Sequence, residues 1–247
     1  MTGAPPAVLV HRDAEVLAAA AAARLVTALA DAQAARGSAS LVLTGGRNGI
    51  AVLAALAAAP ARHAVHWGRV DLWWGDERFL PEGDPDRNAT QAREALLDGL
   101  PLDPARVRPM PASDGPHGAD VAAAAKAYAA ELAAAPGAFD VLLLGLGPDT
   151  HVASLFPGLP GVREEERWVV PVTGSPKPPP TRISLTLPAI RSAREVWLLA
   201  AGPDKAEAAA TALSGADPAT APAAGARGTE RTLWLVDETA ASALPRA

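Results

Sequence analysis

Residues 139–156 read FDVLLLGLGPDTHVASLF, an apolar run followed at once by two glycines, an acid, a threonine and a histidine. The run at 139–144 is apolar almost throughout and does not alternate with polar residues. This pattern is typical of a strand covered on both faces, as in a parallel sheet. Ligands of open parallel sheets bind beyond the carboxyl ends of the strands. The polar residues that follow this strand are therefore the first candidates for a functional site.

Similar apolar runs alternate along the chain with alanine-rich segments. Predicted strands lie at 40–44, 70–74, 139–144, 167–172, 182–187, 195–200 and 232–236. Alanine is the strongest intrinsic helix former, which predicts helices over 14–35, 119–135 and 204–213. This alternation predicts one layered α/β/α domain over residues 1–247, Rossmann-like, with a mostly parallel central sheet.

The composition limits the classes of function. The 247 residues are 49% hydrophobic and 20% charged, as in an ordinary globular protein, and the net charge of −5 argues against a general affinity for nucleic acid. The chain has no cysteine, which excludes disulfides, thiolate nucleophiles and cysteine-bound metals. The sequence shows neither a signal peptide nor a long uncharged apolar stretch, so we expect a cytoplasmic protein without membrane association.

Glycines and charged residues follow two of the early strands. The strand at 40–44 leads into Gly45, Gly46 and Arg47 and then into a helix, an arrangement that forms either a phosphate cradle or a plain tight turn. The strand at 70–74 leads into Asp76, Glu77 and Arg78, which we place on a loop at the mouth of the sheet. Arg78 has the guanidinium geometry that grips a phosphate with two hydrogen bonds.

The later strand ends add an acid, a histidine and further cations. Asp149 precedes His151 by two residues, a spacing that lets a carboxylate orient an imidazole. Asp204 is a predicted helix N-cap with Glu207 completing a capping box, which places Lys205 at the first helical position. A bound anion would offset the unfavourable interaction of that lysine with the helix dipole.

The proline-rich segment GSPKPPPTR at 174–182 joins two predicted strands and is predicted to be a stiff, shaped loop. It carries Lys177 and Arg182 toward the same end of the sheet. With Arg78 and Lys205, these cations predict a site for a phosphorylated small molecule in an otherwise acidic protein.

Five elements in this order resemble the 6-phosphogluconolactonase family of the pentose phosphate pathway, and the similarity runs from about residue 40 to residue 240. The elements are TGGRNG (44–49), WWGDERFL (73–80), GLGPDTHVASLFPG (145–158), TRISLTLPAI (181–190) and AGPDKAEA (201–208). The resemblance implies hydrolysis of 6-phospho-glucono-1,5-lactone to 6-phosphogluconate by a lactonase-like domain without metal or organic cofactor.

The resemblance also implies roles for individual residues. His151 would be the general base that activates water, and Asp149 would set its tautomer and orientation. Arg78, Arg182 and Lys205, with the Gly45–Gly46 backbone, would hold the phosphate or stabilise developing negative charge, and the division of these two duties stays open. A δ-lactone is an activated ester, so a base and preorganised donors suffice. Ser154 lies nearby, but the chain lacks the G-x-S-x-G pattern of a serine hydrolase.

Two residues depart from the pattern of the family. Thr150 stands where the family usually has glycine, and a positive φ there would force the loop to shift or to bear strain. Arg47 stands in a loop that usually carries a small residue, where it would either add a phosphate contact or obstruct the cradle. We expect activity to be retained.

The sequence leaves two alternative functions open. A glucosamine-6-phosphate deaminase/isomerase resembles this chain in its glycine turn and histidine element, but that family has a glutamate where Phe156 stands here. A non-catalytic sugar-phosphate sensor on the same scaffold is the second alternative. The sequence leaves the oligomeric state, monomer or homodimer, open as well.

Overall fold

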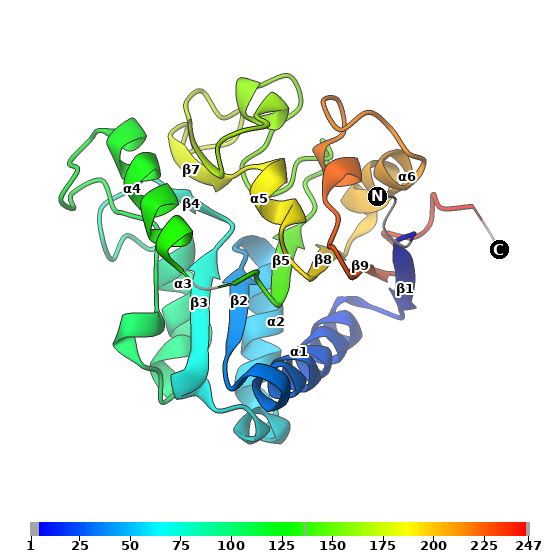
Figure 1. Cartoon of the computed structure of the whole chain (residues 1–247). Coiled ribbons are helices and arrows are strands. Elements are labelled where there is room, and N and C mark those ends of the chain that lie inside the picture. The colour runs from blue at the N-terminus through cyan, green and yellow to red at the C-terminus, as the bar shows by residue number, and fades with distance from the viewer. Residues whose placement is uncertain (1–4, 136, 246–247) are drawn as a thin grey trace.

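The computed structural model describes residues 5–135 and 137–245, which form two sheets flanked by helices (Figure 1). The central sheet has the strand order β1-β9-β8-β5-β2-β3, and every neighbouring pair in it is parallel. Its strands are β1 (Ala7–His11), β2 (Ala39–Leu43), β3 (Val70–Trp74), β5 (Val141–Gly145), β8 (Glu195–Ala200) and β9 (Arg231–Asp237). The predicted α/β fold with a mostly parallel central sheet is confirmed.

The helices follow the alanine-rich segments and begin and end at recognisable caps. They are α1 (Ala14–Arg36), α2 (Gly46–Ala58), α3 (Asn88–Ala95), α4 (Val121–Ala134), α5 (Leu187–Arg191) and α6 (Ala206–Leu213). The Asp13 carboxylate caps α1 by accepting a hydrogen bond from the Val16 N–H at 2.8 Å, and Gly37 ends the helix at a φ of 80°. Helix α1 packs beside α2, and both contact the central sheet.

The structure also contains a second, antiparallel sheet, so the prediction for some of the strands was wrong. It has the order β4-β7-β6, formed by β4 (Asp76–Arg78), β6 (Val169–Val172) and β7 (Arg182–Leu185). The predicted strands at 167–172 and 182–187 thus lie outside the parallel sheet, and the charged stretch that we placed on a loop is β4. The backbone of Gly75 joins the two sheets, since its N–H donates to Leu43 O at 2.9 Å and its carbonyl accepts from the Leu185 N–H at 2.8 Å.

Aromatic side chains fill the space between β3 and α4. Trp73 packs edge-on against Tyr128 and Phe139, with ring centroids 5.9 and 6.1 Å apart. The Tyr128 hydroxyl accepts a hydrogen bond from the Trp74 N–H at 3.0 Å. Helix α4 also covers β6 and β7, so it holds the antiparallel sheet beside the end of β3.

A buried carboxylate ties β4 to the start of α3. The Glu77 side chain is fully buried and accepts hydrogen bonds from the backbone N–H groups of Arg78 (2.8 Å), Asn88 (2.6 Å) and Ala89 (2.9 Å). The guanidinium of Arg87, also buried, lies 3.7 Å from the same carboxylate. Burial raises the pKa of Glu77 to about 7, although Arg87 and the three N–H groups act in the opposite direction. Glu77 therefore fixes β4 against the start of α3, and its side chain is too deeply buried to contact a ligand.

None of the helices in the described part of the chain has the length and apolar character needed to cross a membrane. The single-domain organisation predicted for residues 1–247 stays a prediction. Residues 1–4, 136 and 246–247 lie outside the described residues.

Candidate active site

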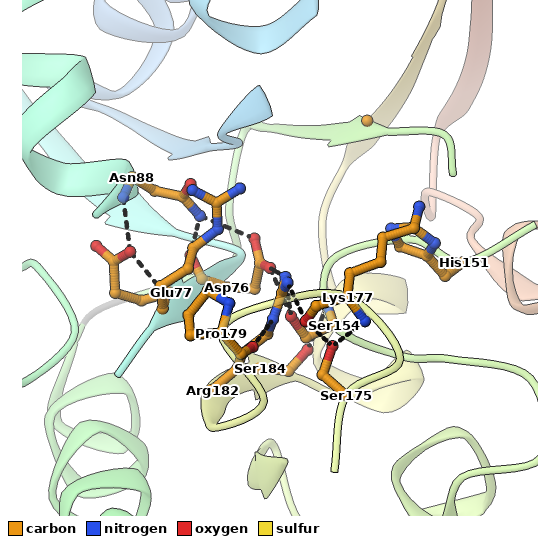
Figure 2. Close-up of polar contacts among 12 residues, drawn as sticks. Asp76, Glu77, Asn88, His151, Ser154, Ser175, Lys177, Pro179, Arg182 and Ser184 are labelled. Carbon is orange, nitrogen blue, oxygen red and sulfur yellow. Dashed lines mark hydrogen bonds and ion pairs between the residues drawn. The ribbon is translucent and has the colours of Figure 1, made fainter. Parts of the chain in front are cut away.

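A cavity of about 400 Å³ opens where β2 and β5 end and α2 begins. The antiparallel sheet and the proline-rich loop form its other side. Of the residues predicted for the site, all line this cavity except Asp149: Gly45, Gly46, Arg47, Asp76, Arg78, His151, Lys177, Arg182 and Lys205. The two sheets therefore bring together groups that are far apart in the sequence, and Figure 2 shows several of them with the contacts that link them.

His151 and Asp149 form a hydrogen-bonded pair. Nδ1 of His151 contacts Oδ1 of Asp149, which leaves Nε2 as the ring nitrogen without this partner. The imidazole packs against Phe156, with ring centroids 4.5 Å apart, and its side chain is 13% exposed. Burial acts to raise the pKa of Asp149, but the hydrogen bond and charge of His151 and the charge of Lys177 outweigh it, so the pKa is about 2. An ionised Asp149 favours the tautomer with the proton on Nδ1 and the lone pair on Nε2.

Lys177 brings a positive charge to this pair. Its Nζ lies 3.7 Å from Oδ1 of Asp149, and its side chain is part-buried. Burial lowers the pKa of Lys177, the charges of Lys205 and Arg182 act in the same direction, and Asp149 opposes them. The cations of the site are thus close enough to repel one another, a cost that a bound anion would reduce.

The first turn of α2 forms the floor on the β2 side. Its N-cap, Gly45, has no side chain to bond the first N–H groups, and the first turn holds no acid. A Cβ atom on Gly45 would lie 1.8 Å from Oδ1 of Asn88, so only glycine fits there. Gly46 has a φ of 75°. This helix start therefore presents backbone donors to the cavity in the manner of an anion site.

The arrangement around Lys205 differs from the predicted capping box. A 3-10 turn over Pro203–Lys205 precedes α6, and Lys205 itself is the N-cap of that helix. The Asp204 carboxylate lies 3.0 Å from Nζ of Lys205 and 3.6 Å from Nη2 of Arg47. The capping prediction for Asp204 and Glu207 is therefore wrong, because the Asp204 side chain pairs with cations of the site.

Arg47 lines the cavity and does not fill the helix start. Its Nη2 donates to the carbonyl of Ala201 at 3.2 Å, and its side chain is 71% exposed. The guanidinium thus bridges the α2 and α6 sides of the cavity rim. It stands where a phosphate at the helix start would be within its reach, which favours the first of the two alternatives considered for this residue.

The sequence alone indicated no role for Asn88, which lines the cavity, or for Ser154, which bonds the cavity-lining Asp76. Ser154 Oγ donates to Oδ2 of Asp76 at 2.7 Å, and Asn88 Nδ2 donates to the backbone carbonyl of Asp76 at 2.9 Å. Oδ1 of Asn88 is buried and has no hydrogen-bond partner among the described residues. Arg78, which also lines the cavity, donates from Nη1 to the carbonyl of Asp86 at 2.6 Å. Asp76 is therefore held from two sides, by groups that no local motif connects.

The backbone of Thr150 has a positive φ, the conformation for which glycine is the better residue. Its φ is 67°, and its carbonyl accepts a hydrogen bond from the Ala223 N–H at 3.0 Å. The side chain is buried and makes one long hydrogen bond, from Oγ1 to the carbonyl of Thr220 at 3.4 Å. A β-branched residue in this region is strained, so the loop that carries His151 stores strain at its centre.

Replacing Thr150 with glycine is expected to stabilise the protein by roughly 1 kcal/mol, since relief of the strained φ exceeds the entropy that glycine adds to the unfolded chain. Thermal denaturation would then show a melting temperature about 2–4 °C higher. Thr27→Gly, inside α1, is the control and should lower the melting temperature. An unchanged or lower melting temperature for Thr150→Gly would mean that position 150 bears no strain.

Gly147 lies against the imidazole and leaves no room for a side chain. A Cβ atom at this position would lie 1.9 Å from Nδ1 of His151 and 2.7 Å from Oδ1 of Asp149. Gly147→Ala is therefore expected to displace the ring. The kcat of a reaction that depends on this imidazole should fall about 100-fold, the loss that misplacement by an ångström can cause. Steady-state kinetics would test this. Gly99→Ala is the control, because nothing lies within 4 Å of its Cβ position, and a full rate in Gly147→Ala would show that the ring position is not limiting.

The fold and the site define an α/β protein with a cavity lined by cationic side chains and a histidine–carboxylate pair. Residues 12–234 match the family described as glucosamine-6-phosphate isomerases/6-phosphogluconolactonase. The chain belongs to this family.

Curated relatives and solved structures agree with this assignment. The chain is 70% identical to a 6-phosphogluconolactonase of Streptomyces coelicolor over 98% of this chain and 96% of that protein. It is 55% identical to a 6-phosphogluconolactonase of Mycobacterium tuberculosis over 94% and 96% of the two chains. The structure of 6-phosphogluconolactonase from Trypanosoma brucei is similar at a TM-score of 0.87 and 28% identity, covering 97% of this chain and 99% of that one. A monomeric glucosamine-6-phosphate deaminase shares the fold at a TM-score of 0.81 and 21% identity, over 96% and 99%.

Proposed function

We propose that this protein hydrolyses 6-phospho-glucono-1,5-lactone to 6-phosphogluconate, the lactonase step of the oxidative pentose phosphate pathway. The observation that carries the proposal is the His151–Asp149 pair in a cavity lined by cations. The 70% identity to a protein named 6-phosphogluconolactonase supports the choice of substrate.

The reaction needs one base and no covalent intermediate. Nε2 of His151 takes a proton from water, and the water oxygen attacks the lactone carbonyl to form a tetrahedral oxyanion. When this intermediate collapses, the bond between the carbonyl carbon and the ring oxygen breaks. The ring oxygen takes up the proton that His151 holds, which regenerates the neutral base and leaves the open-chain acid. Asp149 keeps the imidazole oriented and stabilises its positive charge while the proton is on the ring.

In this proposal, the cations of the cavity divide into two groups according to the groups that they contact. The start of α2, with Lys205 and Arg47 beside it, is suited to the phosphate, because backbone donors and two side chains converge there. Lys177 lies 3.7 Å from the carboxylate of Asp149, so we assign it, together with Arg78 of β4, to the oxyanion or the sugar hydroxyls. The proposed mechanism uses no metal or organic cofactor.

The deaminase alternative is disfavoured by the residue beside the histidine. Phe156 is buried and packs its ring on His151, so a hydrophobic face occupies the place of a carboxylate. The likeness to the deaminase structure, at 21% identity, concerns the fold alone. An assay for ammonia release from glucosamine 6-phosphate would revive this alternative if it showed turnover.

The proposed activity is tested directly with freshly generated lactone, because the substrate also opens spontaneously. The rate of acid release with enzyme, after subtraction of the spontaneous rate, is expected to be proportional to enzyme concentration. Phosphate-free glucono-1,5-lactone is the matched substrate control and should react poorly. Binding of 6-phosphogluconate without any lactone turnover would instead favour the sensor.

The acid side of the pH profile should report one proton. Because the pKa of Asp149 is about 2, its carboxylate stays ionised as the pH falls from about 7 to about 4, so Asp149 adds no protonation step to the profile in that range. A general base acts only when it is unprotonated, so log kcat, measured at saturating lactone with the phosphate bound, is expected to fall with a slope no steeper than about 1 per pH unit in that range. A slope of about 2 would mean that a second group, with Asp149 as the first candidate, titrates together with the base.

A cytoplasmic location and a monomeric or homodimeric state complete the proposal. Neither nucleic acid nor membrane is a proposed partner. Sedimentation of the purified protein would decide between the two states, and fractionation of expressing cells would test the location.

A further inference from the structure

The proline-rich loop 174–181 reaches the cavity through Lys177 and is poor in donors of its own. Prolines 178, 179 and 180 have no N–H, so this stretch cannot close its own backbone hydrogen bonds. The loop makes one bond across its base, from the Ser175 N–H to the carbonyl of Pro180 at 3.0 Å. The carbonyls at its tip therefore depend on donors from elsewhere.

Arg182, the first residue of β7, supplies those donors (Figure 2). Its Nε donates to the carbonyl of Pro179 at 3.1 Å, and its Nη2 donates to the carbonyls of Lys177 and Pro178 at 3.0 and 3.1 Å. Three consecutive carbonyls of the loop thus converge on one guanidinium. Ser175 adds a second contact to the Lys177 carbonyl, through Oγ at 2.8 Å.

The remaining amino group of Arg182 faces the β4 side of the site. Its Nη1 donates to Oγ of Ser154 at 3.4 Å and lies 4.0 Å from Oδ2 of Asp76. The guanidinium also lies over the ring of Phe156, 5.6 Å from its centroid, and the residue is 5% exposed. The edge formed by Nε and Nη2, with which an arginine grips a phosphate, is therefore already occupied.

We propose that Arg182 is a positioning residue for the lactonase reaction, which fixes the loop so that Lys177 stands beside the His151–Asp149 pair. This role replaces the phosphate contact expected from the sequence, and it rests on the proposed function. The guanidinium links the loop to Ser154 and Phe156, which belong to the segment that follows His151. The ammonium of Lys177 is thereby held 3.7 Å from the Asp149 oxygen that bonds the imidazole.

A double-mutant cycle between Arg182 and Lys177 tests this role. Lysine at position 182 keeps the charge but cannot present a planar fork to three carbonyls. We expect Arg182→Lys and Lys177→Ala each to lower kcat/KM by roughly 10–100-fold, the loss expected when a group of the site is misplaced. The double variant should be no slower than the more impaired single variant, because both changes remove the same positioned ammonium. Multiplying losses, or an unchanged rate in Arg182→Lys, would overturn the proposal.

Two further variants separate a positioning effect from a folding defect. Arg191 also donates to a backbone carbonyl, that of Gly225 at 2.8 Å, but does not line the cavity, so Arg191→Lys should keep the full rate. Ser175→Ala loosens the same loop without altering Arg182. It should lower kcat/KM in the wild-type background and have no effect in Lys177→Ala, and an equal loss in both backgrounds would contradict the proposal.

The same variants distinguish failure of this inference from failure of the proposed function. If the wild-type protein does not hydrolyse the lactone, the proposed function fails, and the cycle is then measured as the affinity for 6-phosphogluconate. Non-additive losses of affinity would still support the role of Arg182 in placing Lys177. Additive losses would indicate that Arg182 contacts the ligand itself.

Discussion

Replacing His151 with alanine is expected to lower kcat/KM for the lactone by about 10²–10⁴-fold, the contribution of a positioned general base. The proposed base is Nε2 of His151, because the contact with Asp149 engages the other ring nitrogen, Nδ1. Affinity for 6-phosphogluconate should change little, because the start of α2, Lys205 and Arg47 remain in place. Lactone hydrolysis and titration calorimetry with 6-phosphogluconate would measure the two quantities separately.

The His151→Ala experiment also separates an enzyme from a sensor. His63 lies outside the cavity and is exposed, so His63→Ala controls for the loss of a histidine as such. A catalytic His151 predicts a large loss of rate with retained affinity, whereas a sensor has no rate to lose. If His151→Ala kept more than a tenth of the wild-type rate, another group would have to activate the water, and the proposed mechanism would fail.

The strand ends of the central sheet could be predicted because each depends on a local pattern. Runs that are apolar on both faces indicate buried parallel strands, and the carboxyl ends of such strands meet at one edge. This geometry brought Gly45, His151 and Lys205 into one cavity, although they come from distant segments. The His151–Asp149 contact followed from a spacing of two residues, which is also local information.

The antiparallel sheet and its contacts could not be predicted, because they depend on pairing between segments that are distant in the sequence. An apolar run such as 167–172 looks the same whether its partner strand is parallel or antiparallel. The strand β4 has three charged residues, and it is a strand because β7 supplies its hydrogen bonds. Asn88 enters the site only through the packing of α3 on β4. Glu77 and Arg182 are likewise each buried by segments remote in sequence. For this reason the role that we propose for Arg182 differs from the contact with substrate that the sequence predicts.

Replacing Glu77 with glutamine is expected to lower the free energy of unfolding by about 1–3 kcal/mol, the usual cost of leaving a buried donor without its acceptor. Oε1 of Glu77 accepts from Arg78 and Asn88, and Oε2 accepts from Ala89 and faces Arg87. A glutamine amide must turn an NH₂ group toward donors on one of these sides. At least one buried N–H and the guanidinium of Arg87 then lose their partner. Because these groups have no access to water, the loss lowers the free energy of unfolding.

Thermal denaturation would show this loss in Glu77→Gln as a melting temperature lower by roughly 2–12 °C, at about 2–4 °C per kcal/mol for a chain of this size. Glu82→Gln is the matched control, since Glu82 is exposed and follows the same strand, and its melting temperature should stay unchanged. Because Glu77 holds Asn88 and Ala89 at the start of α3, the variant should also lose activity before it unfolds globally. A stable and fully active Glu77→Gln would contradict this prediction. It would show that Glu77 is protonated in the fold and that the contact with Arg87 adds no stability to the junction of β4 and α3.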